Sequence, residues 1–340
     1  MNHRNNFNFL RIFAAVLVAV THSYAITGNA LQEPLHKFSN GTFYLSTIGL
    51  YIFFFTSGYL VSLSASNSKS PLIFLKKRIL RIYPALIVVV LISVFIAGPL
   101  LTKFSLKQYY TEADTWKYLW TSSGFKIRFR LPGVFEQPGF AIAGFNGSLW
   151  TISLELELYT LLLFILLAGV FRNRRLLISL FIVLIIFCLV IVILHKHLPF
   201  FPDNKNLLLA CAFFFGGLLQ TGFIPKKYFT YLFLVSGVLL ILKISQIIPV
   251  DILIDEVIFF SLTTYFIAFT RLFYFNIKND ISYGVYIYTF PLQQLFFQLS
   301  GFSQSVIMNL LLSLVCSCIL ALLSWIYIEK PALQHKNQLS

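Results

Sequence analysis

The chain has 340 residues, of which 58% are hydrophobic and 11% are charged. A mean hydropathy of +0.81 excludes an ordinary soluble domain. The apolar runs are continuous rather than alternating, which favours membrane helices over a barrel. Although the formal charge is +14, the basic residues lie mostly between apolar runs. That pattern is typical of orientation signals and argues against nucleic acid as a partner.

The sequence predicts an all-α, polytopic helical membrane protein with about ten transmembrane helices. The four cysteines lie in apolar segments without disulfide or zinc-site spacing, and no metal site is expected. No small-residue cleavage site follows the first apolar run, so we expect a retained helix and not a signal peptide. The expected spans are 7–26, 43–65, 80–101, 149–170, 175–194, 206–222, 228–248, 254–273, 281–300 and 303–328.

Ten crossings place both termini on the same side of the membrane. If that side is the cytoplasm, the inner segments hold sixteen of the 26 Lys and Arg residues. Six of the other ten lie in the long connection 102–148, and long loops cross membranes largely regardless of charge. We therefore predict that both termini are cytoplasmic and that 102–148 is an extracytoplasmic loop.

The first span, Phe7 to about Ile26, carries Arg11 near one end and His22 near the other. Ionisable side chains within a span are costly, and they mark a functional site by default. Eleven residues of helix bring His22 to within about 20° of the face of Arg11, roughly 16 Å further along the axis. The alternative is a snorkelling arginine and an interfacial histidine.

Arg78 and Arg81 share one face at the cytoplasmic mouth of the third span. Such a basic pair is usually an orientation signal or a contact for lipid headgroups. The sharper alternative is a clamp for phosphates, since arginine offers a two-pronged donor. The connection 102–148 adds aromatic and basic residues that suit a sugar and a phosphate-bearing carrier, or equally an ordinary interfacial loop.

The fourth span begins near Trp150, which marks the outer interface. Glu155 lies about 7 Å deeper, at a depth similar to that expected for His22, so the two side chains can pair. Glu157 points some 200° away from Glu155, whereas Tyr159 shares its face. In the ninth span, polar residues including Tyr286, Gln293 and Gln294 surround Pro291. They could line a cavity or satisfy the broken helix.

Gly58 lies among aromatic residues in the second span, which suggests close helix packing. The sixth to eighth spans are poor in ionisable groups, and we expect them to be scaffold.

Four motifs together resemble the acyltransferase 3 family of integral-membrane acyltransferases, which modify bacterial surface polysaccharides. They are Arg11 followed by His22, FFFTSGYLV in the second span, Arg78-x-x-Arg81 followed by Tyr83-Pro84, and SLWTISLELELY in the fourth. The ninth span's SYGVYIY and the terminal IEKP add weaker support. The resemblance covers about residues 5–331, and it implies a single membrane domain over 1–340.

The resemblance implies that His22 and Glu155 are catalytic and that Arg11, Arg78 and Arg81 bind the donor. Two positions depart from the family pattern: Leu156 replaces a second glutamate, with Glu157 offset by one, and Thr289 stands where many members have histidine. Candidate acceptor or pocket residues are Ser148, Trp150, Tyr159 and Tyr286.

The expected activity is transfer of an acyl group, acetyl in the first instance, from cytoplasmic acyl-CoA to a hydroxyl of an extracytoplasmic or lipid-linked glycan. Acetyl-CoA would be a co-substrate, with no permanently bound cofactor. The expected location is the bacterial cytoplasmic (inner) membrane. The alternative is a proton-coupled transporter or polysaccharide exporter, which also uses intramembrane Arg, His and Glu. The absence of an internal sequence repeat favours the enzyme.

Overall fold

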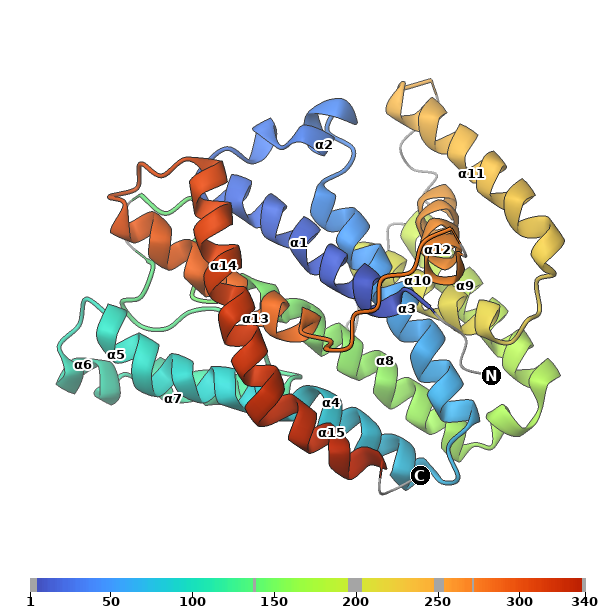
Figure 1. Cartoon of the computed structure of the whole chain (residues 1–340), viewed down its shortest axis with the longest axis horizontal. Coiled ribbons are helices and arrows are strands. Elements are labelled where there is room, and N and C mark those ends of the chain that lie inside the picture. Colours follow the sequence, from blue (N-terminus) through green and yellow to red (C-terminus); the bar gives the residue numbers. More distant parts are fainter. Residues whose placement is uncertain (1–4, 137–138, 195–203, 248–253, 271, 338–340) are drawn as a thin grey trace. The chain divides into compact units, whose positions relative to one another are not determined.

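The computed structural model describes residues 5–136, 139–194, 204–247, 254–270 and 272–337. Within these ranges the regular elements are all helices (Figure 1). The chain forms two compact units whose segments alternate along the sequence. The first unit comprises 1–14, 34–74 and 158–278, and the second comprises 15–33, 75–157 and 279–340.

Three helices run through both units: α1 (Phe7–Ile26), α4 (Pro71–Ile92) and α8 (Trp150–Leu167). The other helices of the first unit are α2 (Pro34–Phe38), α3 (Leu45–Ser66), α9 (Arg174–Ile193), α10 (Asn204–Gln220), α11 (Phe229–Ile244) and α12 (Ile254–Phe269). The other helices of the second unit are α5 (Gly98–Leu101), α6 (Leu106–Thr111), α7 (Ala113–Lys117), α13 (Ser282–Leu299), α14 (Val306–Ser324) and α15 (Lys330–Asn337).

The first unit is built on a close contact between α3 and α10. A Cβ atom added to Gly58 would lie 1.9 Å from the carbonyl oxygen of Phe213, and one added to Gly216 would lie 2.4 Å from that of Phe55. Only glycine permits two helix backbones to approach this closely. The close packing expected of Gly58 among its aromatic neighbours is therefore confirmed.

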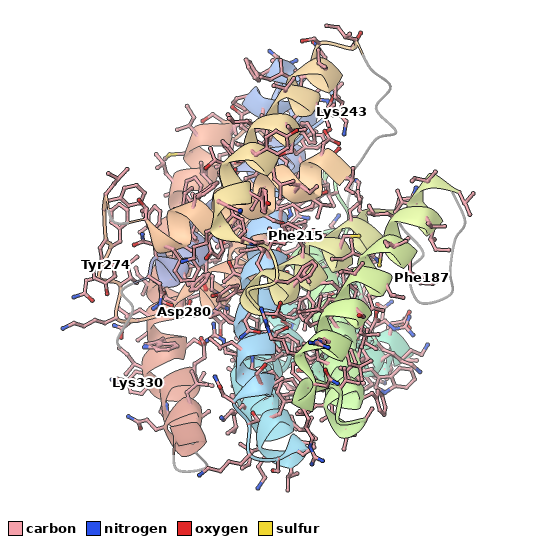
Figure 2. The ribbon with its side chains drawn as sticks, turned by 90° about the vertical axis from the view of Figure 1, so that its right-hand side faces the viewer. Phe187, Phe215, Lys243, Tyr274, Asp280 and Lys330 are labelled. Carbon is pink, nitrogen blue, oxygen red and sulfur yellow. The ribbon has the colours of Figure 1, made fainter. Side chains whose placement is uncertain are left out.

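A buried ionic cluster lies between α11 and α12 of the first unit. The ammonium group of Lys243, near the end of α11 (Figure 2), donates to Asp255 at 2.9 Å and to Glu256 at 3.0 Å. Tyr51 of α3 donates its hydroxyl to Glu256 at 3.3 Å. The sequence treats these spans as plain scaffold, so the cluster is an unpredicted feature. It shows that a buried lysine can be held where opposite charges surround it.

The second unit is organised around α13, which packs against α14. Its Gly284 lies where a Cβ atom would be 2.7 Å from Ala321 of α14. Two π-helical turns interrupt the long helices beside it, at Ser93–Ala97 after α4 and at Trp325–Glu329 after α14. Such turns redirect side chains without ending the helix, and they occur often at functional sites.

The described residues include seven helices that are long and apolar enough to cross a membrane. The chain is therefore a multi-pass helical membrane protein. Each of the ten expected spans coincides with a helix over most of its length, but the number that cross, and the cytoplasmic side of the termini, remain predictions. The seven are Phe7–Ile26, Leu45–Ser66, Pro71–Leu101, Gly147–Leu167, Arg174–Ile193, Lys226–Ile244 and Val306–Gln334.

Candidate functional site

Helix α13 and the first turns of α8 run antiparallel, and this register sets the levels of the candidate residues. Gly147 lies against the ring of Phe290, where an added Cβ atom would be 2.8 Å from the ring. One turn on, the hydroxyls of Thr151 and Tyr286 are 2.8 Å apart. The start of α8 is also tied to α13 by Asn146, whose side-chain amide donates to the backbone carbonyl of Ile287 at 2.8 Å.

Glu155 lies one turn beyond Thr151 on α8, at the level of the first residues of α13. The antiparallel register of the two helices places it opposite Tyr283. The order along α13 is therefore Tyr283 near Glu155, Tyr286 at Thr151, and Phe290 at Gly147. Adjacent steps of this series are about one helical turn apart.

His22 contacts α13 at the other end of this series. Its imidazole, partly buried, lies edge-on to the ring of Phe290, with ring centroids 5.0 Å apart and planes at 86°. Since Tyr283 and Tyr286 precede Phe290 by seven and four residues, Glu155 lies about 6–10 Å from the level of His22 along the helix.

The predicted pairing of His22 with Glu155 remains a prediction. The sequence estimate took Trp150 as a common outer level for both side chains. In the structure, His22 instead lies level with Gly147, which precedes Trp150. His22 and Thr151 of α8 therefore contact different turns of α13, at Phe290 and at Tyr286.

A polar network fixes the segment of α1 that carries His22. Gln293 of α13 donates its side-chain amide to the carbonyl oxygen of Ala19 at 2.8 Å and to the hydroxyl of Ser23 at 2.7 Å. Ser23 donates to Asn309 of α14 at 3.0 Å, and Asn309 donates to the carbonyl oxygen of Gln293 at 2.9 Å. These side chains are fully buried. The network joins α1, α13 and α14, and it binds α1 at Ala19 and Ser23, which lie on either side of His22 in the sequence.

The adjacent Gln294 ties α13 to the end of the connection 102–148. Its amide donates to the carbonyl oxygens of Ile142 at 2.7 Å and Gly144 at 3.2 Å. Thus the two glutamines beside Pro291 bind neighbouring segments. Within 102–148, Lys126 and Arg128 lie over the ring of Trp120 at 5.6 and 5.9 Å, a cation–π arrangement that orders this basic stretch.

The opposite end of α13 holds a second set of charges. Arg81 of α4 forms an ion pair of 2.7 Å with Asp280, just before α13, and approaches Glu329 at 3.7 Å. Ten residues separate Asp280 from Phe290, which corresponds to about 15 Å of helix. Helix α13 therefore has the Arg81 ion pairs at its start and the imidazole contact near its middle, at Phe290.

The remaining candidate residues fall into both units. Ser148 is buried beside Asn146, whose side chain accepts from its backbone N–H at 3.2 Å. Trp150 begins α8, and Arg78 lies one turn before Arg81 on α4. Arg11 belongs to the first unit, as does Tyr159, whose hydroxyl is 2.9 Å from that of Ser57.

Thr289, which stands where many family members have histidine, faces α14. Its hydroxyl donates to the carbonyl oxygen of Val285 at 2.6 Å and to Ser317 at 2.9 Å. Glu157 accepts from the hydroxyl of Ser153 at 3.2 Å. Among the described residues no group of three or more His, Cys, Asp or Glu side chains is arranged to hold a metal ion.

Another face of α13 lines an apolar cavity of about 380 Å³ between α4 and α14. Tyr288, Pro291, Leu292 and Leu295 contribute to it, at helical spacings of three and four residues. A different face of α13 carries Tyr286, Phe290 and Gln293. The cavity is therefore separate from the side chains that contact His22 and α1.

Several residues of this site were not predicted from sequence. Asp280 was missed, although its side chain accepts from the backbone N–H of Ser282 at 3.3 Å, and an acidic residue just before a helix is a recognisable start signal. Glu329 was noted only as part of a chain-terminal motif. Ser23 and Asn309 carry no local signal, because their role depends on the packing of three helices.

Comparisons with known proteins agree with the motifs. Residues 4–329 match the acyltransferase domain family. An O-acetyl transferase of Shigella phage Sf6 is 31% identical over 99% of this chain and 98% of its own length. Nodulation protein 10 of Rhizobium leguminosarum bv. viciae is 34% identical over 46% of this chain and 42% of its own length. No solved structure matches. Because one family model covers nearly the whole chain, the protein belongs to this family of membrane acyltransferases.

Proposed function

We propose that the protein transfers an acetyl group from cytoplasmic acetyl-CoA to a hydroxyl group of an extracytoplasmic or lipid-linked glycan, in the bacterial inner membrane. The observation that supports this proposal is the order of groups along α13. The Arg81 ion pairs at the start of α13 and the His22 contact near its middle lie about 15 Å apart along one helix. The name of the phage relative supports acetyl as the group and oxygen as its acceptor.

In this proposal His22 is the general base. Its imidazole accepts the proton of the acceptor hydroxyl as the hydroxyl oxygen attacks the thioester carbonyl. The carbon–sulfur bond then breaks, and the proton passes to the CoA thiolate, so that the products are an acetyl ester and CoA thiol. Phe290 and the Gln293 network hold the imidazole in position, which is worth a large factor in rate when the reacting groups are aligned.

Glu155 has a different place in this proposal from the one the sequence indicates. It lies one turn beyond Thr151 on α8, opposite the first turn of α13 and on the Arg81 side of Phe290. We assign it to the path of the acyl donor between the arginine end and His22. On the acceptor side of this proposal we place Ser148 and Trp150, because they closely follow Gly147, which lies level with His22.

The donor contact is assigned to Arg78, which the resemblance pairs with Arg81. A guanidinium group binds phosphate through two parallel hydrogen bonds, and CoA carries phosphates at the end remote from its thiol. The predicted donor roles of Arg11 and the pocket role of Tyr159 rest on the resemblance alone.

The deciding experiment compares the surface polysaccharide of cells that express the wild-type gene, a His22→Ala variant or a His36→Ala variant. We expect O-acetyl signals in the NMR spectrum with the wild type and with His36→Ala, and none with His22→Ala at equal protein level. His36 is a suitable control because it stacks on Tyr44 in the first unit. Unchanged O-acetylation by His22→Ala would overturn the assignment of the base.

A second measurement separates an enzyme from a transporter. Membranes containing the protein should release CoA thiol from acetyl-CoA at a rate that depends on His22. A transporter would move a proton or glycan without consuming acetyl-CoA. Absence of CoA release in membranes whose cells show gene-dependent glycan export would favour the transporter.

A further inference from the structure

Arg81 is held between two carboxylates of the second unit. One guanidinium nitrogen lies 2.7 Å from Asp280, and the other lies 3.7 Å from Glu329. The exposed fractions of the three side chains are 14%, 11% and 2%, respectively. Charges this deeply buried are retained only where they are paired and hydrogen-bonded.

Each carboxylate is anchored to its own segment. Asp280 accepts from the backbone N–H and from the hydroxyl of Ser282, in the first turn of α13. Glu329 accepts from Ser324 at 3.2 Å and ends the π-helical turn before α15. Figure 2 labels Asp280 and Lys330, the residue that follows Glu329. Arg81 therefore connects α4, the start of α13 and the end of the α14 segment.

Two further hydrogen bonds join the same three segments. Tyr283 donates its hydroxyl to the carbonyl oxygen of Ile82, at 3.2 Å. The indole of Trp325 donates to the side-chain oxygen of Asn279, also at 3.2 Å. The ion pairs thus lie within a small set of contacts that fixes the ends of three helices.

The charge of this cluster opposes a direct contact with the donor's phosphates. One guanidinium and two carboxylates carry a formal charge of −1 together. A phosphate that approached Arg81 would be repelled by Asp280 and Glu329, and it would have to displace a carboxylate from a short ion pair. Arg78 lies one turn earlier on α4.

We propose that Arg81 is a positioning residue, which neutralises Asp280 and Glu329 and fixes the ends of α4, α13 and α14, and that it does not bind the donor's phosphates. The activity test of this inference rests on the proposed function, because it compares Arg78 and Arg81 as contacts for the donor's phosphates. Its stability test is independent of that function.

The stability test uses neutral variants of the whole cluster in detergent-solubilised protein. Arg81→Gln alone, and Asp280→Asn with Glu329→Gln, each leave buried charge without its partner and should lower the Tm by about 6 °C or more. The triple variant Arg81→Gln/Asp280→Asn/Glu329→Gln should recover most of that loss. A triple variant as unstable as Arg81→Gln alone would overturn the proposal.

The activity test compares acetyl-CoA with S-acetylpantetheine, a donor without phosphates. The triple variant should keep the wild-type ratio of KM values for the two donors within about threefold. Arg78→Gln should raise the KM for acetyl-CoA by about tenfold or more while leaving that for S-acetylpantetheine unchanged, as expected for a lost charged hydrogen bond. If the triple variant shows the same selective loss as Arg78→Gln, Arg81 is a phosphate contact and the proposal is wrong.

The two tests separate this inference from the proposed function. If the wild-type protein consumes neither donor, the proposed function fails, whereas the Tm values of the single, double and triple variants still decide whether Arg81 and its carboxylates act as one unit. If the wild type is active and the Tm values are additive, the proposed function stands and the positioning role of Arg81 is refuted.

Discussion

The imidazole of His22 lies edge-on to the ring of Phe290, with the ring centroids 5.0 Å apart. Gly147 packs against that same ring, where a Cβ atom would come within 2.8 Å of it. Phe290 thus contacts both the helix that carries His22 and the start of α8. An edge-on contact depends on the position of both rings. The position of the imidazole therefore depends on its contact with Phe290 of α13.

Replacing Phe290 tests whether this contact positions His22. Phe290→Ala should lower kcat for acetyl transfer by about 10- to 100-fold, because an imidazole displaced by about 1 Å loses alignment with the reacting hydroxyl. The KM for acetyl-CoA should change little, since the proposed function places the donor's phosphates at Arg78. Steady-state kinetics on protein in nanodiscs would measure both constants.

Phe290→Leu provides the control for lost packing. It retains most of the buried volume and should keep the Tm within a few degrees of the wild type, whereas Phe290→Ala removes a buried aromatic ring at a cost of about 3–5 kcal/mol. If Phe290→Ala keeps the wild-type kcat, the ring does not position the base.

The sequence predicts the helical class and the helix positions because each span is a long apolar run, which is a local property. It also predicts that Gly58 lies at a close helix contact. It does not predict the register of α8 on α13 or the contact of His22 with Phe290, because both depend on how α1 and α8 each pack on α13. A depth counted from Trp150 assumes that both helices start level.

The buried ion pairs also could not be predicted from the sequence. Lys243 looks like a basic residue at the end of a span, and Asp255 and Glu256 look like the acidic first turn of the next helix. Each pattern is ordinary by itself. They form one buried cluster because α11 packs on α12. This packing cannot be inferred from composition or residue spacing.

The Ser23–Gln293–Asn309 network should be strongly coupled. Gln293→Ala leaves the hydroxyl of Ser23 and the carbonyl of Ala19 without their donor, and it should destabilise the protein by about 1–3 kcal/mol. A double-mutant cycle with Ser23→Ala should give a coupling of at least about 0.5 kcal/mol, measured by thermal or denaturant unfolding. The matched control is Ser303→Ala with Gln293→Ala, since Ser303 donates to the carbonyl oxygen of Ser300, outside the network. Additive effects of Gln293→Ala and Ser23→Ala would contradict the network.

Burial should decide the effect of two ion pairs that have equal lengths. Lys243 and Asp255 are fully buried at 2.9 Å, whereas Lys117 and Asp114 are exposed at the same distance. Lys243→Met leaves two carboxylates buried without their cation, so it should cost about 3–5 kcal/mol. Lys117→Met should leave the Tm unchanged, because exposed pairs contribute little.

The neutral triple variant Lys243→Met/Asp255→Asn/Glu256→Gln extends this test. If the cost of Lys243→Met comes from unpaired buried charge, removing both carboxylates should restore much of the stability. A triple variant that remains as unstable as Lys243→Met would show that the lysine acts by packing and not by charge. Differential scanning fluorimetry on the solubilised protein would distinguish these results.

The contact between α3 and α10 makes Gly58 the most sensitive glycine of the first unit. A Cβ atom there would lie 1.9 Å from the carbonyl oxygen of Phe213, and a backbone atom cannot rotate away as a side chain can. Gly58→Ala should therefore force the two helices apart and cost more than the usual 1–3 kcal/mol of overpacking. Gly237→Ala in α11 is the matched control, because its added Cβ would meet only the ring of Phe259, at 3.1 Å. We expect Gly237→Ala to accumulate in membranes at the wild-type level and Gly58→Ala to be depleted. Equal accumulation and equal Tm values for the two variants would show that α3 and α10 do not make this backbone contact.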